Sequence, residues 1–326
     1  MIEILNIIIP CYNCKDTLPD TLNSLISQTQ KKFLVTIVED GFDDNIKDIV
    51  SEYKNKLNIR YIRQWENKGP GLARQIGFDS ESLCEYVLFL DSDDMLMPHA
   101  VEVLNRESSL HKPDILVSNF VQHGKYGISG TVTYKHNSTW LHGKVYSRKF
   151  LEENDIRFST KIRYNEDSFF NTIAFNMAKN ICRTDAITVL WRDNKNSITR
   201  SDRNFAVGSI PEFIIGKIEA LNFLFERKED NDFKEIFSRE IVNIYNHYQI
   251  FLHKNKNMEK IIDIELSNFL GRKEINSLFK DKTFLQLIID SLFRRKKNNF
   301  FETQTFSQFM KNFNIEIEVY DENYTY

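Results

Sequence analysis

The chain has 326 residues, of which 41% are hydrophobic, and its formal net charge is −3. That length suits one large domain or two ordinary ones, and the small net charge excludes a global attraction to nucleic acid or anionic membranes. The first residues lack the basic region of a signal peptide, and no apolar run approaches the roughly 20 residues of a membrane span. Four cysteines outside a secretory context predict reduced thiols and a cytoplasmic location. Cys11 and Cys14 have redox-motif spacing, but no second pair completes a zinc site.

The first hundred residues alternate between strand and helix patterns. Apolar, β-branched runs predict strands at 4–9, 33–38, 59–62 and 86–90. Helical spacing predicts helices at 18–26, at 46–53, after Gly69-Pro70-Gly71 and at 98–104. This rhythm predicts an α/β fold with a Rossmann-like, mostly parallel, doubly wound sheet.

The pattern changes twice further along the chain. Residues 115–134 read as short strands separated by glycines, and 150–178 as a loop and a helix. Beyond about residue 205, apolar stripes at 212–226, 241–252 and 283–293 predict helices, with a terminal strand at 315–319. We therefore expect an α/β domain at 1–205. An α-helical subdomain at 206–326 would contribute to a binding site or to an oligomer contact.

The most informative motif is Asp91-Ser92-Asp93-Asp94, which follows the fourth predicted strand. In open α/β sheets, ligands bind at the carboxyl ends of the strands. Three crowded carboxylates need a counter-charge, and oxygen ligands suit Mg²⁺ or Mn²⁺, which in turn can bind a diphosphate. The alternative is an acidic turn in which Asp93 or Asp94 caps the helix after Pro98.

Other polar strand ends fall on the same predicted edge of the sheet. Asp40 could accept a hydrogen bond from a base, and Tyr12 could cover the face of that base. A turn, a helix N-terminus and a cation then follow, all suited to a ribose or a diphosphate. The candidate nucleotide-binding residues here are Pro10, Tyr12, Asn13, Glu39, Asp40, Asn67, Gly69, Arg74, Asp91 and Ser92. Each motif alone could be ordinary turn chemistry.

Two later patches add candidates. Glu166 and Asp167 precede an amphipathic helix, where paired acids are either caps or a catalytic base. Arg192 and Arg200 could hold a leaving diphosphate or form surface ion pairs.

The ordered set resembles the family-2 glycosyltransferases of the GT-A fold. The resemblance covers roughly residues 3–200 and includes, besides the motifs above, Trp140 followed by Gly143-Lys144. It implies that Asp40 binds the base of a nucleotide sugar. It also implies that Asp93 is the main metal ligand, that Asp91 and Asp94 contact metal or ribose, and that Asp167 is the general base.

Several positions depart from that pattern. Glu39 and Phe42 replace the usual Asp and Ser, and no His in 185–200 matches the third metal ligand of some GT-A enzymes. A Gln-x-x-Arg-Trp motif of processive relatives is absent. The resemblance thus implies a non-processive, inverting, hexosyltransferase-type enzyme with Mn²⁺ or Mg²⁺ and a nucleotide-diphosphate sugar, a UDP-sugar being favoured. Residues beyond 200 are not covered.

The acceptor is the most open part of the interpretation. A hydroxyl of a glycan, a lipid-linked molecule or a protein is favoured over hydroxylated bases of modified DNA. The basic stretch 293–297 is either a helix end or a contact with an anionic membrane surface, a lipid-linked acceptor or nucleic acid. A homodimer stays open. In another functional class, the alternative is a non-catalytic nucleotide- or glycan-binding module. A nucleotidyltransferase is disfavoured, because 11–15 contains no glycine.

Overall fold

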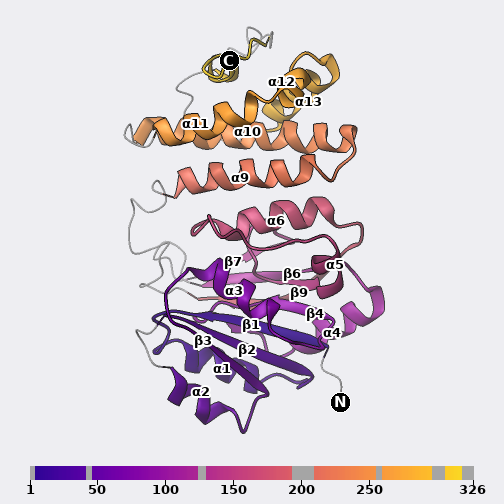
Figure 1. The fold of residues 1–326 in the computed structure, drawn as a ribbon. Coiled ribbons are helices and arrows are strands. Elements are labelled where there is room, and N and C mark those ends of the chain that lie inside the picture. Colours follow the sequence, from indigo (N-terminus) through magenta and orange to yellow (C-terminus); the bar gives the residue numbers. More distant parts are fainter. Residues whose placement is uncertain are drawn as a thin grey trace. The chain divides into compact units, whose positions relative to one another are not determined.

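The computed structural model describes residues 4–41, 46–123, 130–192, 209–254, 259–295 and 305–317 (Figure 1). The chain divides into two compact units, Met1–Asn196 and Ser197–Tyr326. The boundary expected after residue 205, Phe42 and Arg200 lie outside the described residues.

The first unit alternates strands and helices from its beginning, as its sequence pattern predicts. The strands are β1 (Leu5–Cys11), β2 (Phe33–Asp40), β3 (Ile59–Gln64), β4 (Tyr86–Phe89), β5 (Met95–Leu96), β6 (Ile115–His123), β7 (Thr131–Tyr134), β8 (Lys144–Ser147) and β9 (Ile181–Trp191). The helices are α1 (Leu18–Ile26), α2 (Lys47–Tyr53), α3 (Pro70–Asp79), α4 (Ala100–His111), α5 (Arg148–Glu153) and α6 (Glu166–Met177).

Within the described residues these strands form one mixed sheet in the order β3-β2-β1-β4-β8-β6-β9-β5, with β7 paired to β6. The pairs β3–β2, β2–β1 and β1–β4 are parallel, so their carboxyl ends share one edge. Strand β8 enters antiparallel between β4 and β6. The sequence did not anticipate this antiparallel insertion, but the predicted parallel edge, with its polar strand ends, is present.

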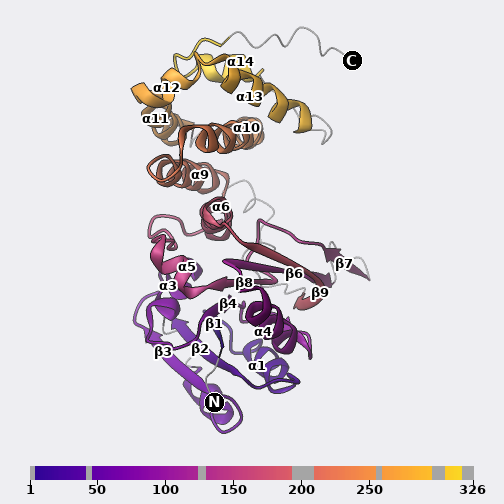
Figure 2. The same ribbon diagram turned by 90° about the vertical axis from the view of Figure 1, so that its right-hand side faces the viewer.

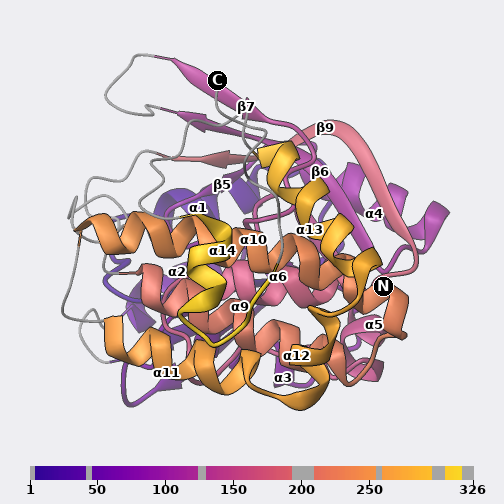
Figure 3. The ribbon, with the colours of Figure 1, turned by 90° about the horizontal axis from the view of Figure 1, so that it is seen from above.

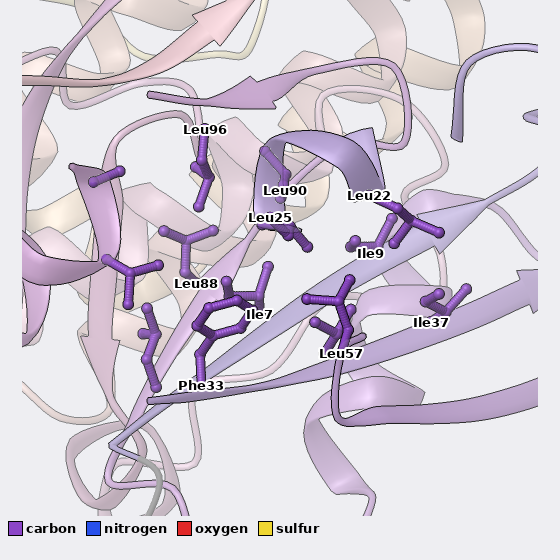
Figure 4. Close-up of a cluster of buried hydrophobic side chains, with 14 of the residues drawn as sticks. Ile7, Ile9, Leu22, Leu25, Phe33, Ile37, Leu57, Leu88, Leu90 and Leu96 are labelled. Carbon is purple, nitrogen blue, oxygen red and sulfur yellow. The ribbon is translucent and has the colours of Figure 1, made fainter. Parts of the chain in front are cut away.

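Helices cover both faces of the sheet, because alternate residues of a buried strand point to opposite sides. Ile7 and Ile9 of β1 pack in one cluster with Leu22 of α1, Val50 of α2 and Leu104 of α4, and Figure 4 shows part of this cluster. Helix α3 lies on the other face (Figure 2). There Gly77 permits a close approach, since a Cβ at that position would lie 2.5 Å from Ile8 Cγ2.

The second unit consists of helices in its described part: α9 (Ile210–Phe225), α10 (Asp230–Lys254), α11 (Glu259–Leu270), α12 (Lys273–Leu278), α13 (Lys282–Arg295) and α14 (Phe306–Lys311). The three predicted apolar stripes correspond to α9, α10 and α13. Helix α10 packs against α9, α13 and α14, and Figure 3 looks onto this unit from above. Residues 315–317 have no regular structure, so the described part of the expected terminal strand is not a strand; the remainder lies outside the described residues. Among the described helices, none is both long enough and apolar enough to cross a membrane.

Candidate active site

The acidic motif forms a tight turn directly after β4. Asp94 is only 1% exposed, and its backbone N–H donates to the carbonyl of Asp91 at 3.1 Å. Helix α4 begins at Ala100 with His99 as its N-cap residue, so the alternative that Asp93 or Asp94 caps this helix is wrong. The turn is therefore free of a capping role, and its carboxylates remain on the edge where the parallel strands end.

Arg74 joins the acidic turn to the start of α6. Its Nη2 lies 2.5 Å from Asp91 Oδ1, and its Nη1 lies 2.6 Å from Glu166 Oε1. One buried guanidinium thus serves two carboxylates. Burial raises the pKa of Asp91, but the charges of Arg74 and His142 outweigh this effect and lower it overall. For Glu166 burial dominates, and its pKa rises to about 7. Arg74 therefore lies between two site acids, rather than presenting its whole guanidinium to a diphosphate.

Asp167 lies beside Glu166 in the first turn of α6, whose N-cap residue is Asn165. Its side chain is partly exposed, and its Oδ1 accepts a hydrogen bond from the N–H of Ser168 at 2.7 Å. Burial raises the pKa of Asp167, although that hydrogen bond and the charge of Arg74 oppose the rise. The neighbouring Lys144 is fully buried, and burial lowers its pKa to about 7 against the favourable charge of Asp167. A partly exposed carboxylate with a raised pKa has the properties of a general base.

A small hollow lies where β1 and β2 end. It is lined by Cys11, Tyr12, Asn13, Cys14, Glu39, Gly41 and Ile46. Tyr12 follows Pro10 at the end of β1 and is 42% exposed. Cys11 and Cys14 are free, buried thiols, and burial raises the pKa of Cys11. Tyr12 and Asn13, which the sequence proposed for base binding, both line this hollow.

The two acids at the end of β2 have different surroundings. Asp40 accepts hydrogen bonds from the backbone N–H groups of Lys68 at 2.9 Å and Gly69 at 2.8 Å, one on each carboxylate oxygen. Glu39 lines the hollow, and its carboxylate accepts from Ile46 N at 3.2 Å and pairs with Arg63 Nε at 3.2 Å. Asp40 therefore shapes the loop after β3, while Glu39 is the acid that borders the hollow.

The loop that Asp40 holds leads directly into α3. Asn67 Oδ1 accepts from Gly69 N at 3.1 Å and from Arg163 Nη2 at 3.0 Å. Gly69 is the N-cap residue of α3, with φ of 92°, and Pro70 is its first residue, as the sequence predicted. The loop at 67–69 is therefore held by hydrogen bonds from its backbone N–H groups to Asp40 and Asn67.

Arg192 lies at the acidic turn, but its guanidinium is already engaged. Nη1 pairs with Asp20 Oδ2 at 2.6 Å, and Nε donates to the carbonyl of Asp93. The backbone N–H of Arg192 donates to Asp94 Oδ1 at 3.0 Å. On the other side of the turn, Thr21 Oγ1 donates to the carbonyl of Ser92 at 2.9 Å. Arg192 therefore braces the turn from β9, and Ser92 contributes its backbone.

His142 is the site residue that the sequence analysis missed. Its Nε2 lies 2.9 Å from Asp94 Oδ2 and 3.9 Å from Asp91 Oδ2. Burial lowers its pKa, but the hydrogen bond and charge of Asp94, together with Asp91, raise it overall. No histidine lies in 185–200, and His142 lies instead in the stretch from Trp140 to Lys144 that the family resemblance includes. Ligand atoms of Asp91, Asp94 and His142 lie within 4.8 Å of one another, a nitrogen and oxygen set that fits a divalent cation.

Comparison with known proteins identifies relatives of this chain. The model of the family described as Glycosyl transferase family 2 matches residues 6–190. The uncharacterized glycosyltransferase EpsJ of Bacillus subtilis is 27% identical over 223 residues, covering 61% of this chain and 64% of EpsJ. The poly(ribitol-phosphate) beta-N-acetylglucosaminyltransferase TarS of Staphylococcus aureus is 29% identical over 191 residues, covering 54% of this chain and 33% of TarS. The chain thus spans less than two thirds of these relatives.

Solved structures agree on the fold. TarS 1–349 of S. aureus in complex with UDP-GlcNAc superposes with a TM-score of 0.68 at 20% identity, covering 90% of this chain and 92% of that chain. The mannosyltransferase PcManGT of Pyrobaculum calidifontis, in complex with GDP-Man and Mn²⁺, gives a TM-score of 0.53 at 14% identity, covering 90% and 88%. These likenesses confirm the predicted α/β fold with C-terminal helices.

Proposed function

Because the chain belongs to glycosyltransferase family 2, we propose that it transfers a sugar, with inversion, from a UDP-sugar to an acceptor hydroxyl. The observation that carries this proposal is the arrangement around Arg74. That single buried cation links Asp91 of the acidic turn to Glu166, and Asp167 follows Glu166 in the same helical turn. A donor-side acid and a candidate base are thereby fixed in one place, as a transfer between two bound substrates requires.

On the donor side, the base binds against Tyr12, Asn13 and Glu39, which border the shallow hollow where β1 and β2 end. Tyr12 is exposed enough for its ring to cover one face of the base. The diphosphate lies toward Asp91-Ser92-Asp93, and Asp91 and Asp93 would hold a divalent cation there. When bound, such a cation neutralises the charge that develops on the departing diphosphate.

On the acceptor side, Asp167 accepts the proton of the attacking hydroxyl. Its raised pKa strengthens it as a base, because proton transfer is most effective when the pKa approaches the working pH. Glu166 and Lys144 do not need to contact the acceptor in this scheme. Glu166 keeps α6 joined to Arg74, and the buried Lys144, whose pKa burial lowers to about 7, adds a positive charge near Asp167 only in its protonated form.

The names of the relatives favour a polymer as the acceptor. TarS and a Bacillus spizizenii protein, which is 30% identical over 194 residues and of which the match covers 30%, are both named as transferases acting on poly(ribitol-phosphate). We propose by extension that this chain glycosylates a hydroxyl-rich glycan or polyol-phosphate polymer, rather than the bases of modified DNA.

A donor screen tests the proposal directly. Purified protein is incubated with UDP-GlcNAc, UDP-glucose or GDP-mannose, with Mn²⁺ or with EDTA, and nucleotide release is measured with and without poly(ribitol-phosphate). We expect Mn²⁺-dependent release of UDP that increases with acceptor, and a product whose anomeric configuration is opposite to that of the donor. Absence of nucleotide-sugar binding under every condition would contradict the proposal, and a product of retained configuration would contradict inversion.

A further inference from the structure

His142 provides one of two hydrogen bonds that the protein makes to the carboxylate of Asp94. Its Nε2 donates to Asp94 Oδ2 at 2.9 Å, and the backbone N–H of Arg192 donates to Asp94 Oδ1 at 3.0 Å. Each oxygen of this buried carboxylate therefore already has a partner from the protein. Because Asp94 ends the turn that begins at Asp91, fixing Asp94 also fixes the backbone that carries Asp91 and Asp93.

The ring of His142 is itself held by its neighbours. It stacks on Trp191 with a centroid distance of 4.8 Å and an interplanar angle of 25°, and its centroid lies 5.1 Å from that of Phe120. The next residue, Gly143, has φ of 70°, and its carbonyl accepts from Ser118 N at 2.7 Å and Ser118 Oγ at 2.9 Å. A Cβ at Gly143 would lie 2.8 Å from the Ser118 carbonyl oxygen, so this turn depends on a glycine.

A buried lysine completes the support. Lys144 is 0% exposed, and its Nζ donates to the carbonyls of Trp140 and, at 3.4 Å, of His142. Burial of an ammonium group is costly unless its hydrogen bonds compensate. The buried ammonium group of Lys144 therefore holds the backbone of the turn at 140–143, and with it the position of His142.

Two roles for His142 are chemically reasonable, and its second nitrogen distinguishes them. A histidine that binds a metal almost always donates its other ring N–H to a carbonyl or carboxylate. His142 Nδ1 is buried and has no hydrogen-bond partner among the described residues. Its Nε2 is directed at Asp94 instead. This geometry favours a histidine that orients the acidic turn over one that binds the cation.

We infer that His142 is a positioning residue, which holds Asp94 out of the metal's coordination and thereby sets the turn through which Asp91 and Asp93 bind a divalent cation with UDP. The inference rests on the proposed function of the acidic turn. It gives Asp94 a role different from the metal ligand that the sequence suggested. It also adds His142, which lies 48 positions from Asp94 in the sequence, to the residues that support the metal site.

The test compares His142→Gln with His142→Met, two side chains of similar length of which only Gln can donate a hydrogen bond to Asp94. Binding of Mn²⁺ is followed by the electron paramagnetic resonance signal of free Mn²⁺, with and without UDP, so no catalysis is required. Loss of an outer-shell partner typically weakens metal binding by roughly 10- to 100-fold. We expect that loss for His142→Met, and affinity within about threefold of the native protein for His142→Gln.

Two further variants complete the design. Asp94→Leu, which has no hydrogen-bond acceptor, should resemble His142→Met, and the double variant should be no weaker than either single variant, because both interrupt the same bond. His136→Gln is the matched control, since His136 also faces a carboxylate, Asp185, at 3.4 Å but belongs to neither group of described residues whose ligand atoms could hold a metal. Thermal unfolding followed by circular dichroism checks that each variant folds.

The possible outcomes are distinct. Native-like affinity in His142→Met would overturn the inference, and equal loss in His142→Gln and His142→Met would show instead that the imidazole binds the metal directly. If the native protein itself bound no Mn²⁺ with UDP, the proposed function would fail, independently of His142.

Discussion

The pKa values of two buried glutamates, one in each unit of this protein, are shifted in opposite directions. At the acidic site, Asp91 and Glu166 share the one guanidinium of Arg74, and burial leaves the pKa of Glu166 raised to about 7. In the helical unit, Glu240 of α10 faces Lys217 of α9 at 3.0 Å, with both side chains buried. Despite burial, the charge of Lys217 and hydrogen bonds lower the pKa of Glu240 to about 2.

This difference separates function from stability. When a buried carboxylate has too little positive charge nearby, its charged form is unfavourable, and a bound cation or an accepted proton relieves this. Such perturbed acids are typical of functional sites. An acid with its own buried cation stabilises the fold once both partners are present. The acidic site should therefore respond strongly in activity, and the Lys217–Glu240 pair should respond in stability alone.

The largest effect is expected for Asp167→Asn. Loss of a general base typically lowers the rate by roughly 10²- to 10⁴-fold. The free energy of unfolding should not fall, because burial already disfavours the charged form of this carboxylate. Turnover is measured by UDP release and UDP affinity by calorimetry, with the substitution Asp79→Asn at the end of α3 as control. Native turnover would remove Asp167 from the base role, and a loss of UDP affinity as large as the loss of turnover would assign it to donor binding instead.

A comparable effect, but on stability, is expected for Lys217→Met. It removes the buried cation of Glu240 and leaves only the half-exposed Arg239 at 3.3 Å, so the loss should approach the about 3–5 kcal/mol typical of breaking a buried pair without exceeding it. The double variant Lys217→Met/Glu240→Leu should recover most of this loss, because an apolar pair of similar volume needs no desolvation. Urea unfolding followed by far-UV circular dichroism measures both, and the exposed Lys273→Met is the control. A double variant as unstable as the single one would contradict this account.

Much of the acidic site could be predicted because parallel strands impose a simple rule. Polar residues that follow apolar strands must meet at one edge, and Tyr12, Asp91 and the loop at Asn67 do so. That rule needs only the strand pattern, which the residues of β1, β2, β3 and β4 display clearly.

What the sequence could not supply was the partner of each side chain. Glu39 and Asp40 are neighbours in the chain, yet a strand turns them to opposite sides, so one borders the hollow and the other holds a loop. The contact between His142 and Asp94 could not be predicted from the sequence. His142 comes close to Asp94 because the strand that follows it, β8, pairs antiparallel with β4, and no helical crossover in the sequence indicates that pairing. The residue types indicated which kind of ligand the site could bind. The hydrogen-bond partner of each side chain depended instead on contacts between segments that are far apart in the sequence.

A smaller effect on stability is expected on acidification, through Glu240. Its pKa is about 2 in the folded protein and about 4.5 when unfolded, so it stabilises the fold fully above the unfolded pKa. This contribution, on the order of 3 kcal/mol, is lost as the pH falls from about 4.5 to about 2. Urea unfolding followed by circular dichroism at several pH values measures the loss. Glu240→Gln should flatten the dependence, and an unchanged slope in that variant would contradict the assignment.

The smallest effect should have the opposite sign and should come from Glu166. Its pKa is raised to about 7, so the folded protein binds this proton more tightly than the unfolded chain, and stability rises as the pH falls from about 7 toward 4.5. Asp91 uses the same Arg74 but has a lowered pKa, so its own contribution to stability is lost only below about pH 3.8, outside this range. All three tryptophans, Trp65, Trp140 and Trp191, lie in the first unit, so their fluorescence during urea unfolding follows the acidic site separately from the Lys217–Glu240 pair. If Glu166→Gln left that rise in stability intact, the unequal sharing of Arg74 would not be its source.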